Sequence, residues 1–206
     1  MKTILQINAS IQAGNGQSSK LADEFVAGLR EQHPDAKLIV RDLARDPVPH
    51  LDAERFGAFV TPIEKQTARQ QEVIDYSDAL IAELKRADAI VLGLPMYNFG
   101  VPSQLKAWFD HVARAGVTFR YTEKGPVGLL TGRKAWVLAT RGGRYAGTPG
   151  DHETPFVRQF LGFLGISDVE FVYAEGLAIS ETSKREALAG AVNAIRRLLG
   201  EFWLAA

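Results

Sequence analysis

Short apolar runs alternate with apolar stripes at helical spacing along the whole chain, and this alternation constrains the fold more than any other feature. Five runs are typical of short core strands: Thr3–Asn8, Lys37–Asp42, Ala87–Leu94, Lys134–Thr140 and Val169–Ala174. Parallel strands need crossover connections, and a sheet built from them must be covered on both faces. The alternation therefore predicts an α/β fold with a doubly wound, five-stranded parallel sheet and helices on both faces.

Apolar residues three and four positions apart predict the intervening helices. These stripes run over 21–29, 73–84, 105–112, 156–164 and 188–202, the last one ending at Phe202. Capping-box patterns at Thr67 with Gln70 and at Ser183 with Glu186 are expected to open two of the helices. The stretch from Val48 to Phe59 shows no clear pattern, and we expect it to be irregular.

One segment departs from the alternation of strands and helices. Residues 117–131 hold alternating apolar positions broken by Lys124-Gly125-Pro126, which predicts a hairpin-like excursion. No internal repeat, low-complexity tract or linker divides the 206 residues. We therefore expect a single domain over 1–206.

Composition excludes several classes of function. Lys plus Arg equal Asp plus Glu at 24 each, so no basic excess favours nucleic acid. The chain has no cysteine, which excludes disulfides, thiolate nucleophiles and iron–sulfur clusters. No apolar run is long enough for a membrane span, and the apolar start is too short for a secretory signal, so we expect a cytoplasmic protein. Redox chemistry in this chain would need a bound cofactor.

The first loop after a strand, residues 9–19, has the composition of an anion site. In a doubly wound sheet, ligands bind beyond the carboxyl ends of the strands. Ser10, Gln17 and Ser18 offer side-chain donors near the start of a helix, although Ser18 as a plain helix cap and Gly16 as a plain turn residue remain an equal alternative. A P-loop run is absent and the dinucleotide fingerprint is only partial, which favours one phosphate, as in FMN.

Two further loops follow strands at the same predicted edge. The segment Pro95-Met96-Tyr97-Asn98-Phe99 is rich in large apolar side chains, which either pack into the core or line a flat ligand. Thr140-Arg141-Gly142-Gly143 can expose backbone amides, or form a plain turn. Together with the first loop, these features suit a phosphorylated planar heterocycle.

Other residues that carry chemistry in many enzymes form no recognisable site. His33, His50, His111 and His152 share no metal-ligand spacing, and Asp110-His111 is expected to be a surface pair. A G-x-S-x-G nucleophile elbow is absent from the sequence. Hydrolysis and metal chemistry are therefore disfavoured, which leaves cofactor-borne redox chemistry or plain binding.

Several of these segments resemble one family over almost the whole chain. Ser10 with Gly16-Gln17-Ser18, PMYNF at 95–99, LKAWFDHVARAGVTF at 105–119 and TRGG at 140–143 are similar to the FMN-dependent NADH-azoreductases, flavodoxin-like quinone and azo-dye reductases. The segments PMYNF and RAGVTFRYTE are specific to that family. The resemblance implies a flavodoxin-like fold and one FMN per subunit of a homodimer.

The resemblance also assigns roles to individual residues. It implies cofactor contacts by Ser10, Gly16, Gln17, Ser18, Pro95, Met96, Tyr97, Asn98, Phe99, Thr140, Arg141, Gly142 and Gly143. It implies a substrate pocket shaped by Phe99, Phe119, Tyr121 and Phe163, with no indispensable acid or base because the FMN carries the hydride. Residues 50–66 depart from the family pattern in a region expected to reach the partner subunit.

The implied activity is the ping-pong, two-electron reduction of quinones and azo compounds by NADH or NADPH. A flavodoxin-like one-electron carrier would use the same fold and cofactor. Such carriers usually present a strongly acidic docking face, which a chain with balanced charges does not favour. A non-catalytic nucleotide-binding module is the third reading.

Overall fold

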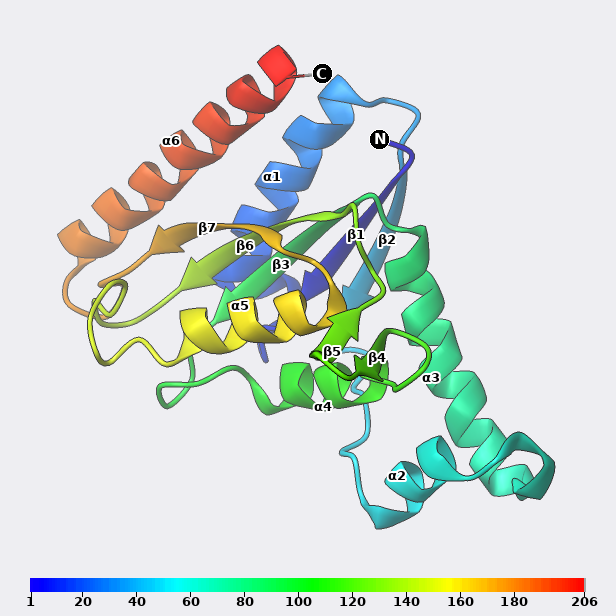
Figure 1. Cartoon of the computed structure of the whole chain (residues 1–206). Coiled ribbons are helices and arrows are strands. Elements are labelled where there is room, and N and C mark those ends of the chain that lie inside the picture. The colour runs from blue at the N-terminus through cyan, green and yellow to red at the C-terminus, as the bar shows by residue number, and fades with distance from the viewer. Residues whose placement is uncertain (206) are drawn as a thin grey trace.

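The central sheet of the computed structural model has five parallel strands in the order β2-β1-β3-β6-β7 (Figure 1). The strands are β1 (Thr3–Asn8), β2 (Lys37–Asp42), β3 (Ala89–Pro95), β6 (Lys134–Thr140) and β7 (Asp168–Ala174). The strand order reverses between β1 and β3, which is the switch point of a doubly wound fold. The predicted sheet is confirmed.

The structure describes the backbone of residues 1–205 and the side chains of residues 1–200, so the predicted core residue Phe202 lies outside the described side chains. Helices cover both faces of the sheet, with α1 (Gln17–Gln32) and α6 (Glu181–Ala205) on one face and α3 (Ala68–Arg86), α4 (Ser103–Val112) and α5 (Glu153–Leu164) on the other (Figure 1). None of the helices within residues 1–205 is long and apolar enough to cross a membrane.

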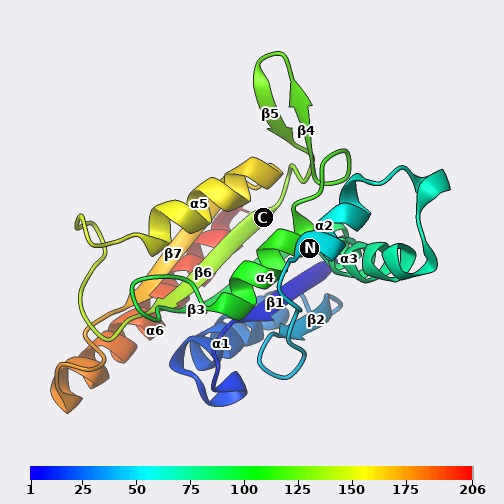
Figure 2. The same ribbon diagram turned by 90° about the horizontal axis from the view of Figure 1, so that it is seen from below.

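The smaller elements lie away from the sheet. The hairpin of β4 (Phe119–Thr122) and β5 (Gly125–Gly128) projects from the body, as predicted for 117–131 (Figure 2). Helix α2 (Ala53–Val60) and the short turns η1 (Ala13–Asn15) and η2 (Ile63–Lys65) complete the elements.

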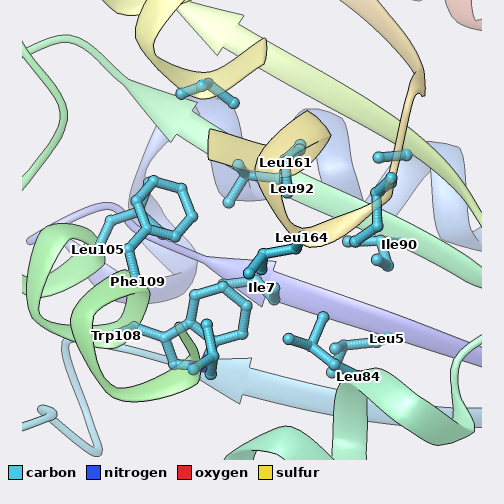
Figure 3. Packing of buried hydrophobic residues seen from close by; sticks show 14 of the residues in the cluster. Leu5, Ile7, Leu84, Ile90, Leu92, Leu105, Trp108, Phe109, Leu161 and Leu164 are labelled. Atoms are coloured by element: carbon cyan, nitrogen blue, oxygen red, sulfur yellow. The ribbon is translucent and has the colours of Figure 1, made fainter. Parts of the chain in front are cut away.

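Neighbouring residues of β3 pack into opposite layers of the core. Ile90 and Leu92 lie in the cluster formed with α3, α4 and α5, which also contains Trp108 and Leu164 (Figure 3). Val91 points to the other face, where it joins Phe25 and Trp136. Each fully buried side chain of this size stabilises the fold by about 1.5–3 kcal/mol. The near-continuous apolar sequence of β3 follows from this burial on both faces.

Three details of the predicted strands and helices are wrong. The strand β2 is not buried, because it lies at the sheet edge, where Val40 is 53% exposed. Part of the stretch expected to be irregular forms α2, whose Asp52 cap accepts a bond from the Arg55 N–H at 2.8 Å. The predicted Ser183 capping box is displaced, because α6 starts at Glu181 and Ser180 caps it. The box at Thr67 and Gln70 is confirmed.

His111 is buried instead of forming the expected surface pair with Asp110. It is 0% exposed, and its Nδ1 lies 2.9 Å from the Ala107 carbonyl oxygen. The rings of Phe59 and Tyr76 pack edge-on against it, each at 5.9 Å between centroids. Burial lowers the pKa of His111, because a charged ring at this position would have no water to solvate it.

The lowered pKa of His111 makes the fold sensitive to acid. An unfolded histidine has a pKa near 6.5 and takes up a proton below that pH, whereas the buried ring of His111 resists protonation. The free energy of unfolding therefore falls as the pH drops below about 6.5. We expect His111→Gln to flatten the loss of unfolding free energy between about pH 7 and 5, by up to ~1 kcal/mol. Urea titrations at several pH values measure this slope.

The exposed His50 provides the control, since His50→Gln should keep the slope of the parent protein. A His111→Gln variant with an unchanged slope would show that His111 does not determine the acid sensitivity.

Candidate functional site

Three loops that follow strands meet at the edge of the sheet where the strand order reverses. The Ala9 N–H donates to the Gly93 carbonyl at 3.0 Å, so the first loop starts directly beside β3. The Met96 N–H donates to the Thr140 carbonyl at 3.0 Å, which joins the second loop to the end of β6. The structure therefore brings the predicted loops together.

The N-terminus of α1 is open to an anion. Gly16 caps the helix without a side-chain hydrogen bond from the described residues, and the first turn contains no acidic residue. Its N–H groups and the positive end of the helix dipole favour a negative charge. The Oγ atoms of Ser18 and Ser19 are buried there and have no hydrogen-bond partner among the described residues. A phosphate at this turn would supply acceptors for the orphaned hydroxyls.

Two glycines allow close approach at this turn, Gly16 to a side chain and Gly93 to a backbone. A Cβ on Gly16 would lie 2.2 Å from the Ser10 Oγ, and a Cβ on Gly93 would lie 2.9 Å from the Ser18 carbonyl oxygen. Both distances are shorter than real Cβ contacts. Sequence analysis missed Gly93, although a glycine inside an apolar strand is a signal of close backbone approach.

The second loop is a tight turn in an unusual backbone conformation. Tyr97 and Gly100 exchange backbone hydrogen bonds of 3.0 and 3.1 Å, and the two residues between them have positive φ angles, 49° at Asn98 and 67° at Phe99. A bulky side chain at such an angle costs conformational energy and often marks a functional position. The turn leaves the Phe99 ring 58% exposed, where it meets Tyr145 edge-on at 5.8 Å between ring centroids. The Ser10 Oγ and the Tyr97 hydroxyl, 3.3 Å apart, connect this turn to the first loop.

A cleft of about 260 Å³ joins the second and third loops. Its lining residues are Met96, Asn98, Phe99, Gly142, Gly143 and Tyr145. Five of these residues are among the predicted cofactor contacts. Tyr145 was missed, because nothing in its local sequence distinguishes it from an ordinary loop residue.

The third loop is held from behind by the turn that follows β7. The N–H groups of Gly176, Leu177 and Ala178 donate to the carbonyls of Gly143, Arg141 and Gly142 at 2.8, 3.1 and 3.0 Å. The N–H groups of Gly142 and Gly143 take no part in these bonds. They are therefore the groups that the loop can offer to a ligand in the cleft.

The guanidinium of Arg141 makes its hydrogen bonds within the protein. Its side chain is fully buried and its three nitrogens each bond a different carboxylate, Asp151 at 3.0 Å, Glu153 at 3.3 Å and Glu175 at 3.1 Å. Its N–H donates to the Ala174 carbonyl, and its carbonyl accepts from Leu177. The sequence places Arg141 in the correct loop, but every polar group of the residue bonds within the protein.

One guanidinium cannot balance three carboxylates, and Glu153 is the one whose ionisation burial opposes. Burial raises the pKa of Glu153 to about 8, against the opposing charge of Arg141. Its Oε1 is buried with no partner in the described part of the chain. Burial therefore favours the protonated form of Glu153.

The four residues of the implied substrate pocket lie at two places. Phe119, Tyr121 and Phe163 gather where the hairpin meets α5, with the rings of Phe119 and Phe163 4.2 Å apart and Tyr121 74% exposed. Phe99 and Phe163 line different cavities, of about 490 and 280 Å³, and Phe156 lines both of them.

Replacing Arg141 should destabilise the protein strongly, because Asp151 and Glu175 would lose their counter-charge and Glu153 would lose its hydrogen-bond donor. We expect Arg141→Met to lower the unfolding free energy by about 3–5 kcal/mol. Urea unfolding at pH 7 measures it. Arg69→Met, which breaks two exposed ion pairs, should change the stability little. A variant at Arg141 as stable as the parent would rule out a stabilising role for the cluster.

Comparison with known proteins places this geometry in context. Residues 2–199 match the family described as having a flavodoxin-like fold. The FMN-dependent NADH:quinone oxidoreductase 6 of Burkholderia lata is 56% identical over 195 residues, which is 95% of this chain and 98% of that protein. The FMN-dependent NADH:quinone oxidoreductase of Alcanivorax borkumensis is 57% identical over 186 residues, 90% of this chain and 94% of that one.

Solved structures agree with these relatives. An azoreductase from Bacillus anthracis superposes with a TM-score of 0.89 at 26% identity, covering 98% of this chain and all of that one. An FMN-dependent NADH-azoreductase from the same species, in complex with FMN, gives 0.85 at 29% identity, with 97% and 100% covered. The resemblance found in the sequence is confirmed: the chain belongs to the flavodoxin-like family of FMN-dependent NADH:quinone oxidoreductases.

Proposed function

We propose that this chain is an FMN-dependent NADH:quinone oxidoreductase that also cleaves azo bonds, built as a single FMN-binding domain over 1–206. The observation that carries the proposal is the pair of orphaned serine hydroxyls at the open N-terminus of α1, beside a cleft suited to a flat ring. The names of the relatives at 53–57% identity support it.

The residues at the sheet edge fit FMN. Ser10, Ser18 and the first amides of α1 would hold the phosphate, with Gly16 leaving room for the Ser10 side chain. Residues 95–99 and the amides of Gly142 and Gly143 would hold the ring system. When bound, FMN accepts a hydride from a nicotinamide and passes two electrons to an acceptor.

The protein's own contribution is to bind, to orient and to place charge. The amides of Gly142 and Gly143 are positioned to stabilise negative charge on a ring in the cleft. The Phe99 ring, braced edge-on by Tyr145, would exclude water from one side of the cleft. No side chain is required as an acid or base in this scheme.

A one-electron carrier is the weaker alternative. Carriers of that type dock on protein partners through a charged surface, and this chain has balanced charge. The relatives are named for small-molecule substrates instead.

The first test is spectroscopic and kinetic. Protein purified with FMN should lose its yellow colour on addition of NADH alone and regain it with benzoquinone. Steady-state rates should give parallel double-reciprocal lines, as expected for ping-pong turnover. Flavin that stays oxidised until a protein reductase is added would favour the carrier.

The matched variant is Gly16→Ala. Its methyl group would collide with the Ser10 side chain, so we expect FMN to bind at least about tenfold more weakly, as judged by quenching of flavin fluorescence. Gly14→Ala is the control in the same loop, because a Cβ there meets no atom within 4 Å. Equal FMN affinity in the two variants would contradict this position for the phosphate.

The proposal includes a homodimer of this chain, located in the cytoplasm. Large apolar side chains are exposed on two projecting segments, with Phe56, Val60 and Ile63 on and after α2 and Tyr121 and Val127 on the hairpin. Exposed apolar groups of this kind are typical of protein interfaces. Sedimentation should give the mass of two chains, and Val60→Glu with Ile63→Glu should shift it toward one. A fully active single chain would refute the homodimer.

A further inference from the structure

The carboxylate of Glu175 lies directly behind the glycine loop. Glu175 follows the last residue of β7, and its side chain is 16% exposed. Its Oε1 accepts three hydrogen bonds, from the Arg141 guanidinium at 3.1 Å and from the N–H groups of Tyr145 and Ala146 at 2.9 Å each. Glu175 does not line the cleft proposed for the flavin ring. Its contact with that cleft therefore runs through the loop that it holds.

The backbone of this loop is fixed on both sides of a short run of free N–H groups. The carbonyls of residues 141–143 accept hydrogen bonds from the N–H groups of residues 176–178. Glu175 accepts from the N–H groups of residues 145–146. The N–H groups of residues 142–144 have no partner in the described part of the chain, and a run of such groups in a turn is a common binding site for negative charge. The bonds on both sides determine where these three N–H groups lie.

The same carboxylate also fixes the ring of Tyr145. A Cβ on Gly143 would lie only 2.8 Å from the Tyr145 hydroxyl oxygen, so the ring covers Gly143 directly. The ring also meets Phe99 edge-on, at 5.8 Å between centroids, and it lines the cleft. Because the backbone N–H of Tyr145 is bound to Glu175, a shift of this carboxylate would move the ring and the free N–H groups together.

We propose that Glu175 is a positioning residue for the flavin site: it holds the N–H groups of residues 142–144 and the Tyr145 ring in place at the cleft. The inference rests on the proposed function, since it requires the cleft to take the ring of FMN. Two-electron reduction places negative charge on that ring, and preorganised backbone donors stabilise such charge. Glu175 therefore raises the reduction potential of bound FMN, although it touches neither the ring nor a substrate.

The sign of the effect separates positioning from a simple charge effect. A carboxylate near the cleft disfavours negative charge on the ring, so removing its charge alone would raise the potential. Loss of the loop position would lower the potential, because the N–H donors would no longer face the charge.

Two replacements of Glu175 distinguish these effects. All three hydrogen bonds are accepted by Oε1, and glutamine keeps an oxygen that can occupy this position. Methionine has a similar length but offers no oxygen acceptor. Both replacements remove the charge, and only methionine releases the N–H groups of residues 145–146.

The test compares Glu175→Met, Glu175→Gln and the control Glu83→Met in FMN-loaded protein. Glu83 on α3 pairs with Arg41, its side chain is 13% exposed, and it does not line the cleft, so the control removes a similar carboxylate elsewhere. Titration with dithionite and a reference dye gives the midpoint potential from the flavin absorbance.

We expect Glu175→Met to weaken the binding of reduced relative to oxidised FMN about tenfold, which lowers the two-electron potential by about 30 mV. Glu175→Gln should stay at the parent potential or slightly above it, and Glu83→Met should match the parent. A potential in Glu175→Met at or above the parent value would overturn the proposal. An equal fall in the glutamine variant would also overturn it, because the N–H groups would then not depend on the acceptor oxygen.

Hydrogen exchange of the FMN-free protein gives a readout without turnover. In Glu175→Met, the peptide that covers residues 141–147 should exchange at least about fivefold faster than in the parent, because two N–H groups lose their acceptor. Glu175→Gln and Glu83→Met should keep the parent rate in this peptide. Unchanged exchange of the loop in Glu175→Met would contradict the positioning role.

Glu175→Asp decides the matter if the methionine variant does not fold. It keeps the charge beside Arg141 but withdraws the acceptor by one methylene group, so the potential should fall in the same direction. An unchanged potential in this variant would overturn the proposal. If NADH fails to reduce the flavin of the parent, the proposed function fails, but dithionite still sets the potential and the variants still decide the role of Glu175.

Discussion

Parallel pairing of β1 with β3 is the constraint on which the site depends. The strands run from Ile4 opposite Ala89 to Asn8 opposite Gly93, so both end at the same level of the sheet. The loop after β1 must turn toward one face and the loop after β3 toward the other, because the strand order reverses there. Backbone amides, an exposed ring and a helix N-terminus are thereby collected at one edge without any metal or disulfide.

Arg141 joins the loops that the sheet brings together. Its guanidinium reaches the start of α5 through Asp151 and Glu153, and the end of β7 through Glu175. Glu175 in turn accepts the N–H groups of Tyr145 and Ala146, each at 2.9 Å, so the same carboxylate fixes the loop that carries Tyr145. The position of the glycine amides thus depends on a charge network that never touches the cleft.

Periodicity in the sequence was sufficient to predict the sheet, the helices that cover it and the loops that meet at its edge. The signals that failed were those decided by contacts between distant segments. His111 is buried because α2 folds over it with Phe59, and nothing near Asp110-His111 records that packing. Arg141 is occupied by carboxylates 10, 12 and 34 positions away, which no local pattern reveals. The strand β2 has the composition of a core strand, and only its place at the sheet edge exposes it.

The left-handed turn at Asn98 and Phe99 has a consequence for attempts to engineer the protein. Glycine at position 99 would relieve a backbone cost on the order of 1–3 kcal/mol, while deleting the ring that lines two neighbouring cavities. Selection for heat resistance alone would therefore favour exchange of this phenylalanine, whereas the ligand contact proposed for its ring would oppose the exchange. At this one position, thermal stability and the proposed function impose opposite demands on the sequence.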